Sequence, residues 1–211
     1  KRELIDAYKS AGRRDEIQTA LKELAAQYKD AEPDVPADLC WLYGSYMDDY
    51  LHDVDICQRF AAHNRVHMLV EILARTGLDA SSEFHTVHNY IDVDEMILRK
   101  GAIAAHEGET VLIPLNMRDG SIIAKGRGNE EWNNSAPHGA GRVMSRREAR
   151  ETLDLREYRT AMEGIYSTSV NERTIDEAPG AYKPIEDIIG PIADAVDIID
   201  VMRPIYNFKA S

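Results

Sequence analysis

The stretches TVLIPLN (Thr110–Asn116) and SIIAK (Ser121–Lys125) decide the fold of this chain. Both are short and mainly aliphatic, and the turn dipeptide Asp119-Gly120 lies between them. Short runs rich in Val, Ile and Thr that are bounded by glycine-containing turns are typical of antiparallel β-strands. The sequence therefore predicts two antiparallel strands in the middle of the chain.

Strand-like segments continue on both sides of this pair. Residues 83–93 and 96–104 have a similar composition, and the turn dipeptide Glu107-Gly108 follows them. Two later segments, near 165–170 and in the apolar tail at about 197–208, are also predicted strands. We therefore expect mainly antiparallel sheets in the second part of the chain.

The first third of the chain has a helical period instead. Ile17, Leu21 and Leu24 recur at steps of three and four with charged residues among them, as a surface helix requires. A second helix is expected over 36–75, where an apolar stripe at helical spacing includes Phe60. Both segments are predicted to be α-helical.

Two further helices are expected in the second half. One covers 146–162, and the other begins at Pro184, a residue type that suits a first helical turn. Pro191 should break or kink this last helix, because proline lacks the N–H group that a helix interior needs.

The fold class that follows is α+β, because helices and strands segregate rather than alternate. We expect one domain portion over 1–211, in which a mainly helical part, 1–77, packs on the sheets of a mixed part, 83–211. The chain starts at Lys1 rather than Met and has no signal peptide. We therefore expect it to begin inside a longer protein, and no motif assigns a role to residues 1–38.

Composition limits the classes of function. The chain has 211 residues, of which 44% are hydrophobic and 29% charged, so it is not a disordered chain. With 25 Lys+Arg against 37 Asp+Glu the net charge is −12, which argues against nucleic-acid binding through bulk positive charge. There is no run of 18 apolar residues, so no membrane partner is expected. Cys40 and Cys57 are expected to be reduced, without a disulfide partner, in a cytoplasmic protein.

One stretch concentrates the candidate chemistry: NNSAPHGAGRVMSRRE, residues 133–148. Gly139 and Gly141 flank a single alanine, so the backbone can turn tightly and bring its N–H groups close to a ligand. Ser145 and Glu148 match a capping box, which predicts a helix start directly after the loop. Four arginines add positive charge in an otherwise acidic chain, at positions 142, 146, 147 and 150. A phosphate-bearing ligand is the expected guest.

His138 precedes this glycine-rich turn. A neutral imidazole there has the chemistry to attack phosphorus and become a covalent phosphoramidate. The simpler interpretation is a helix-capping turn with a solvated histidine and surface arginines. Neither a Walker loop nor the glycine pattern of a Rossmann turn is present in the sequence.

The stretch resembles the guanylylation motif of the RtcB-type RNA-splicing ligases, His-Gly-Ala-Gly-Arg followed by Ser-Arg. It occurs here as His138–Arg142 and then Ser145-Arg146. Other pieces follow in the order found in that family, and the resemblance covers roughly 40–211. These pieces are Val87–Asn89, Val111–Pro114, Glu177–Lys183 and Met202–Ile205 with Lys209.

The resemblance implies a GTP- and manganese-dependent ligase that joins RNA ends bearing a 2′,3′-cyclic phosphate or 3′-phosphate to 5′-hydroxyl ends. Its partners would be RNA ends, either tRNA halves or damaged RNA; a second copy of the chain or an accessory activator stays open. His138 would be the nucleophile that takes GMP from GTP, and His88 would be a Mn²⁺ ligand. The remaining nucleotide contacts would come from Asn116, Ser121, Gly139, Ala140, Gly141, Arg142, Arg146, Tyr182 and Lys209.

Two departures from the family pattern matter. After Pro114 the family usually has Gly-Ser-Met-Gly, whereas this chain has Leu115–Arg118, so Asn116 replaces a small nucleotide contact. The family segments that supply most manganese ligands, Asp-x-Gly-Cys-Gly, Gly-Asn-His and His-x-Gly-Ser-Arg, are absent. One histidine does not make a manganese site. The sequence therefore indicates the C-terminal portion of a ligase-like protein.

Two other functions stay open at this stage. A histidine phosphohydrolase would carry phosphate rather than a nucleotide on His138, but the paired arginine-histidine signature of such enzymes is absent. A non-catalytic module that binds a nucleotide or a protein partner, inactive without an N-terminal metal-binding half, is the main alternative to the ligase.

Overall fold

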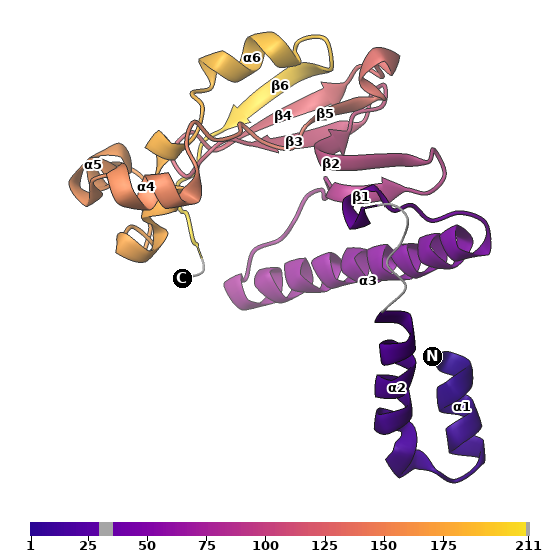
Figure 1. Cartoon of the computed structure of the whole chain (residues 1–211). Coiled ribbons are helices and arrows are strands. Elements are labelled where there is room, and N and C mark those ends of the chain that lie inside the picture. Colours follow the sequence, from indigo (N-terminus) through magenta and orange to yellow (C-terminus); the bar gives the residue numbers. More distant parts are fainter. Residues whose placement is uncertain (30–35, 210–211) are drawn as a thin grey trace. The chain divides into compact units, whose positions relative to one another are not determined.

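The structure is a computed structural model that describes residues 1–29 and 36–209 (Figure 1). By its internal contacts the chain forms two compact units, Lys1–Tyr50 and Leu51–Ser211. The boundary falls inside a long helix, α3, which spans Ser45–Thr76. The sequence predicts one domain portion whose helical part packs on the sheets, and that arrangement stays a prediction.

The first unit is helical, as its apolar period predicts. A helical hairpin comes first, in which α1 ends at Ser10 with Ala11 as its C-cap, and the backbone N–H of Arg13 donates to the Tyr8 carbonyl. Ala20 of the second helix is buried. The elements of this unit before α3 are α1 (Arg2–Ser10), η1 (Arg14–Glu16), α2 (Ile17–Lys29) and η2 (Ala37–Leu39).

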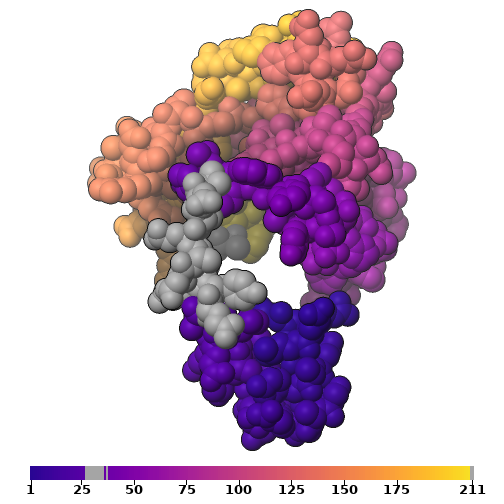
Figure 2. All heavy atoms as spheres, turned by 45° about the vertical axis from the view of Figure 1, so that its right-hand side comes forward, coloured from indigo at the N-terminus to yellow at the C-terminus, as the bar shows by residue number. Residues whose placement is uncertain are grey.

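Helix α3 confirms the helix predicted over 36–75 only from Ser45 onward, and Ala37–Leu39 form the separate short helix η2. The predicted apolar stripe of α3 is not fully buried. No residue of α3 is buried, and Phe60 is 72% exposed; the violet surface of α3 faces the viewer in Figure 2. Other apolar residues of the helix are half-buried, among them Val54 and Val66. The helix is instead tied to the sheet by Gln58, whose side-chain amide donates to the Ile91 carbonyl (3.0 Å) and accepts from the Ile91 N–H (2.9 Å).

The second unit is built on two three-stranded antiparallel sheets, as the α+β prediction requires. Sheet A has the order β1-β2-β5 and sheet B has the order β3-β4-β6. The predicted strand near 83–93 is shorter and begins at His88, and β5 lies inside the motif stretch, where no strand was predicted. The strands are β1 (His88–Asp92), β2 (Ile97–Ala104), β3 (Thr110–Pro114), β4 (Ser121–Gly126), β5 (Ser135–Pro137) and β6 (Val196–Met202).

The main core lies between the sheets and helix α6 (Glu186–Ile192), which covers sheet B in Figure 1. Val111 and Ile113 of β3 point inward with Ile122 of β4, and all three are at most 1% exposed. This inward alternation is what a two-residue period produces when one sheet face is buried. Pro191 lies in the last turn of α6, which ends one residue later, so the expected helix break is confirmed.

The helix predicted over 146–162 is two helices. The first, α4 (Arg146–Thr152), ends at Leu153, whose backbone is extended, and α5 spans Leu155–Ala161. Asp154 starts the second helix, because its carboxylate accepts hydrogen bonds from the first free N–H groups of α5. A local capping signal therefore divides a region whose apolar period is continuous.

The strand predicted near 165–170 is wrong, and the tail strand is shorter than predicted. Near Tyr166 there is a single bridge to Tyr206. The hydroxyl of Ser167 accepts a hydrogen bond from the Ser169 N–H (3.1 Å), a local bond that competes with strand pairing. Strand β6 ends at Met202, just before Arg203-Pro204, because proline cannot donate to a ladder.

A smaller core supports α5 and the 3₁₀ helix η4 (Glu172–Glu177). Tyr158 of α5 is 2% exposed and packs with Met117 and Ile175. A short helix, η5 (Pro179–Ala181), follows η4 directly, and η3 (Glu130–Trp132) precedes β5. No helix in the described residues combines the length and apolar character needed to cross a membrane.

Candidate nucleotide site

A cavity of about 850 Å³ lies in the second unit, and every predicted site residue lines it. Loops after β3 and β5 contribute to its wall, together with the segment after η5 and the end of the chain. Its volume falls within the usual range for ligand pockets. The predicted residues brought together here are His88, Asn116, Ser121, His138, Gly139, Ala140, Gly141, Arg142, Arg146, Tyr182 and Lys209.

His88 and His138 form a stacked histidine pair on the wall of this cavity. Their ring centroids are 4.9 Å apart and their planes differ by 8°. His88 begins β1 and His138 follows β5, and these two strands flank β2. Gly101 of β2 lies against the His138 ring: a Cβ atom there would be in van der Waals contact with Cδ2 of His138 (3.4 Å), and its φ of 68° favours glycine.

Asn89 fixes the backbone beneath the histidine pair. The pairing of β1 with β2 is irregular between His88 and Tyr90, and Asn89 has a positive φ of 57°. Its side-chain oxygen accepts a hydrogen bond from the Gly101 N–H (2.8 Å). Asparagine tolerates this left-handed conformation better than most residues. The bulge therefore lets His88 depart from the regular strand while Gly101 stays anchored.

The motif loop is held on two sides by backbone hydrogen bonds. The Ala140 N–H donates to the Pro114 carbonyl at the end of β3 (3.0 Å). On the other side, the Lys183 N–H donates to the Gly141 carbonyl (3.1 Å). The predicted capping box is confirmed in part: the Ser145 hydroxyl accepts from the Glu148 N–H (3.1 Å) at the start of α4.

Glu177 links the polar groups of the cavity into one network. Its carboxylate accepts from the Tyr182 hydroxyl (2.6 Å), pairs closely with Arg146, and lies 3.4 Å from Nζ of Lys209. Arg142 donates to the same hydroxyl (3.0 Å), and its guanidinium carbon lies 4.7 Å from the Tyr182 ring centroid. We call Arg142, Arg146, Glu177, Tyr182 and Lys209 the Glu177 network.

Asp176 supports this network from behind. Its side chain is only 4% exposed and pairs with Arg146 (2.7 Å) and Arg150 (3.3 Å). Burial favours the neutral acid, but these arginine hydrogen bonds outweigh it and hold the pKa of Asp176 below its usual value. The arginine-rich face is therefore largely neutralised within the chain.

Two further pKa shifts bear on the chemistry. Partial burial of the ring and the neighbouring His88 lower the pKa of His138, which keeps its imidazole neutral near pH 7. Burial and the hydrogen bond to Glu177 raise the pKa of Tyr182 to about 12, so its hydroxyl stays protonated. The cavity therefore presents a neutral imidazole next to a fixed set of charges.

Comparison with known proteins agrees with the motif and its geometry. A family model described as tRNA-splicing ligase RtcB matches residues 13–210. The chain belongs to the RtcB family. The match begins well before residue 40, where the resemblance visible in the motifs starts, so the helical unit is part of the region that resembles the family.

The chain spans less than half the length of the RtcB relatives it matches. RNA-splicing ligase RtcB of Escherichia coli is 34% identical over 183 residues, which cover 78% of this chain and 44% of that protein. For tRNA-splicing ligase RtcB of Aeropyrum pernix, identity is 42% over 106 residues, 46% of this chain and 22% of that protein. The tRNA-splicing ligase RtcB of Pyrococcus horikoshii is 36% identical over 135 residues, which cover 54% of this chain and 15% of that protein.

Asn116, where the chain departs from the usual RtcB pattern, is engaged in its own turn. Its side-chain oxygen accepts from the N–H groups of Arg118 and Asp119, and its amide nitrogen donates to the Asp119 carboxylate (2.8 Å). This is an Asx turn that shapes the loop between β3 and β4. Its predicted contact with a nucleotide stays a prediction.

The described residues do not form a complete manganese site in the cavity. Their one cluster of three ligand-type side chains is Asp92, Glu95 and His106, which do not line the cavity. The buried Arg99 guanidinium donates to both carboxylates (2.9 and 3.1 Å), so it already offsets part of their charge. His88 alone is too small a ligand set for manganese.

Sequence reasoning missed Asp176 and the central position of Glu177. The signal was present, because two adjacent acids directly precede the Ala-Pro-Gly-Ala-Tyr segment of a chain whose arginines cluster upstream. Spacing alone did not show that Arg146 and Tyr182 converge on one carboxylate, because their side chains come from α4 and from the segment after η5.

Proposed function

We propose that this chain is the nucleotide-binding portion of an RNA ligase that joins 2′,3′-cyclic phosphate or 3′-phosphate RNA ends to 5′-hydroxyl ends. GTP would supply the energy through a covalent GMP on His138. The observation that supports this most is the neutral His138 imidazole beside His88, in a cavity of about 850 Å³ that also contains the Glu177 network. Membership of the RtcB family agrees with this reaction class.

The first step is a substitution at phosphorus. A lone pair on an imidazole nitrogen of His138 attacks the α-phosphorus of GTP, an N–P bond forms, and the P–O bond to the pyrophosphate leaving group breaks. A lowered pKa favours this step, because the protonated ring has no free lone pair. The backbone N–H of Gly139 and the guanidinium of Arg142, both on the cavity wall, would stabilise the developing charge.

The base of the nucleotide would lie against Tyr182. One face of that ring is occupied by the Arg142 guanidinium, so a guanine would have to stack on the other face. Lys209 lies beside the same network through Glu177 and would reach the edge of the base. Ser121, half-buried on the cavity wall, would contribute a hydroxyl.

The next two steps transfer GMP and seal the RNA. A 3′-phosphate oxygen of the RNA attacks the phosphorus on His138, the N–P bond breaks, and the imidazole is regenerated. The 5′-hydroxyl of the second RNA then attacks the activated 3′-phosphate, which forms a phosphodiester and releases GMP. A cyclic end requires ring opening by water before this sequence.

Manganese stays in the proposal with His88 as one ligand. A divalent ion beside the phosphates would offset charge on the leaving pyrophosphate. Because His88 is the single metal-ligand histidine that this cavity offers beside the nucleophile, the other ligands would come from beyond the described residues.

Mass spectrometry of the intact parent protein that contains this chain, after incubation with GTP and Mn²⁺, tests the proposal. GMP is expected on His138, the adduct should be absent from His138→Asn, and it should persist in His85→Asn, a matched change of an exposed histidine outside the cavity. A folded protein without the adduct would contradict the ligase chemistry.

The alternative is a non-catalytic nucleotide-binding module, favoured by the incomplete manganese site. Calorimetry separates the two: the module binds GTP or GMP without releasing pyrophosphate, whereas the ligase releases pyrophosphate as the adduct forms. Phosphate rather than GMP on His138 would instead support a phosphohydrolase.

A further inference from the structure

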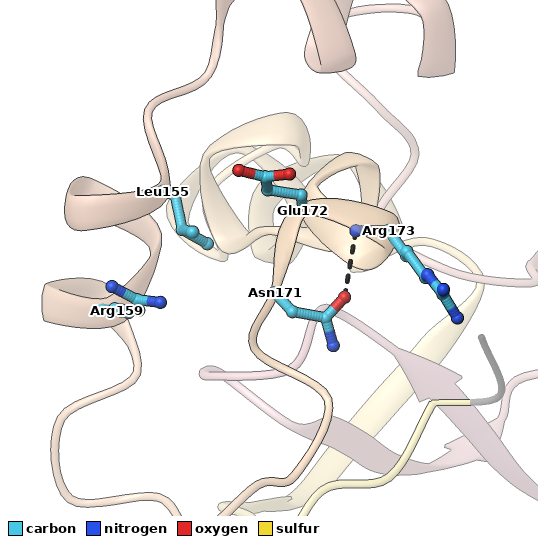
Figure 3. Close-up of a pocket in the computed structure, with 5 residues that line it drawn as sticks. All are labelled: Leu155, Arg159, Asn171, Glu172 and Arg173. Atoms are coloured by element: carbon cyan, nitrogen blue, oxygen red, sulfur yellow. Dashed lines mark hydrogen bonds between the residues drawn. The ribbon is translucent and has the colours of Figure 1, made fainter.

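A second pocket lies between α5 and the start of η4, and it shares no lining residue with the cavity. Its volume is about 440 Å³, and its lining residues are Leu155, Arg159, Asn171, Glu172 and Arg173 (Figure 3). We call it the arginine pocket. Neither the proposed chemistry nor the sequence motifs use any of these residues.

The two arginines of this pocket differ from those of α4. Arg146, Arg147 and Arg150 each pair with a carboxylate. In the part of the chain that the structure describes, Arg159 and Arg173 have no carboxylate oxygen within 4.0 Å. In a protein with a net charge of −12, two guanidinium groups without counter-ions at one concave place are a local site for an anion.

The arrangement suits a chain of phosphates better than a single one. Figure 3 shows the Arg159 and Arg173 guanidinium groups on opposite sides of Asn171. The side-chain oxygen of Asn171 accepts from the Arg173 N–H (2.9 Å), which fixes the residue between them. Leu155 adds an apolar surface on which a ribose or base can lie. Separate positive charges along such a surface match successive phosphates of a strand.

Helix η4 connects this pocket with the cavity. Arg173 lies near its start and Glu177, which lines the cavity, is its last residue. A 3₁₀ helix rises about 2.0 Å per residue, so these two backbone positions are about 8 Å apart. Along a stacked strand the phosphates advance by about 3.4 Å per nucleotide in the direction of the helix axis. A strand whose end lies in the cavity therefore reaches the pocket within a few nucleotides.

We infer that the arginine pocket binds backbone phosphates of a single-stranded RNA whose reacting end lies in the cavity. This rests on the proposed function and deepens it, because it gives the ligase a second contact with its substrate, a few nucleotides from the joint. Glu172 is the unfavourable group in this pocket, since its carboxylate repels phosphate.

The test measures binding of 3′-phosphorylated single-stranded RNA to the full chain. For an RNA of about ten nucleotides, Arg159→Glu with Arg173→Glu should lower affinity on the order of tenfold at moderate salt. The slope of log affinity against log salt should fall by about 1.4, about 0.7 for each lost phosphate contact. A trinucleotide, too short to reach the pocket, should be unaffected.

Two controls make the test specific. Arg14→Glu with Arg156→Glu makes the same change of charge at two exposed arginines that line neither the pocket nor the cavity, and it should leave affinity nearly unchanged. Glu172→Gln should strengthen binding of the longer RNA, a gain that misfolding does not produce.

Three results would overturn the inference: equal losses in the two double variants, an equal loss for the trinucleotide, or no RNA binding by the unaltered chain. The GMP adduct on His138 is measured separately in each variant. It should form normally in Arg159→Glu with Arg173→Glu, so its absence from every protein speaks against the ligase chemistry and not against the arginine pocket.

Discussion

The histidine pair and the Glu177 network line one cavity but are held in place by different means. His88 and His138 stack across Gly101, and the strands of sheet A fix their positions. Members of the Glu177 network come from α4, η4 and the chain end, and side-chain hydrogen bonds and ion pairs connect them. The positions of the two histidines therefore depend on the backbone of sheet A, whereas the positions of the Glu177 network depend on ion pairs and hydrogen bonds between its side chains.

This difference matches what each group is proposed to do. A nucleophilic imidazole needs one nitrogen with a free lone pair, and positioning the ring by strands and packing leaves that nitrogen unoccupied. Arginines that face a phosphate need a fixed orientation before the ligand binds, and the partly buried carboxylate of Glu177 supplies it. Changes in sheet A should therefore affect chemistry, and changes in Glu177 or Asp176 should affect charge and stability.

The largest expected effect comes from Gly101→Ala. Gly101 has a φ of 68°, and an added Cβ would lie 3.4 Å from Cδ2 and 3.6 Å from Nε2 of His138. Those distances are ordinary van der Waals contact, but the left-handed conformation costs an alanine about 1–2 kcal/mol. Relief of this strain would shift the Gly101 carbonyl, which accepts a hydrogen bond from the His138 N–H (3.3 Å), and the nucleophile with it. We expect the rate of GMP adduct formation on His138 to fall on the order of a hundredfold, measured by single-turnover labelling.

Gly108→Ala is the matched control for this change. Gly108 has a similar φ of 75°, but an added Cβ would meet nothing within 4 Å. Both variants should lose similar free energy of unfolding, and only Gly101→Ala should lose the adduct. Equal labelling rates would show that backbone at Gly101 does not position His138.

The second effect concerns Asp176 and acid stability. Because its pKa is lowered in the folded state, Asp176 stabilises the protein above its unfolded pKa, and this stabilisation is lost as the pH falls below about 4. Asp176→Asn should lower the free energy of unfolding near pH 7 by about 1–2 kcal/mol, a value reduced because Arg146 and Arg150 are more than half exposed. Urea unfolding from pH 7 to 3 measures the difference.

In acid the free energies of unfolding of wild type and Asp176→Asn should converge. Glu151→Gln breaks a pair with Arg147 in which both side chains are at least 60% exposed, and it should change stability little at any pH. A constant difference between wild type and Asp176→Asn across the pH range would contradict an ionic role for Asp176.

The same contrast explains what the sequence predicts well. The α+β class, most strands and the helix start at Ser145 follow from signals within a few residues, namely apolar periods, turns and a capping box. The Arg146 and Tyr182 positions follow from the family motif. Local and motif signals therefore lead to the cavity that the structure contains.

Tertiary contacts account for what the sequence does not predict. The stack of His88 on His138 depends on Gly101, a residue from a third strand that no motif marks. The burial of Phe60 was wrongly implied by its helical period, because period gives the side of a helix and not what covers it. Near Tyr166, apolar content favoured a strand, but a side-chain hydrogen bond at Ser167 prevailed.

The smallest effect tests the network directly through Tyr182. Burial comes first among the causes that raise its pKa to about 12, and the hydrogen bond and charge of Glu177 come next. Glu177→Gln removes the charge, so the pKa of Tyr182 should fall toward the ordinary tyrosine value of about 10 while burial keeps it above that value. Absorbance titration of the phenolate in Glu177→Gln, with and without Tyr182→Phe, isolates this group. A Glu151→Gln control should leave the midpoint of the titration unchanged. An unchanged midpoint in Glu177→Gln would mean that burial alone keeps the Tyr182 hydroxyl protonated. Glu177 would then not organise the charged side of the cavity.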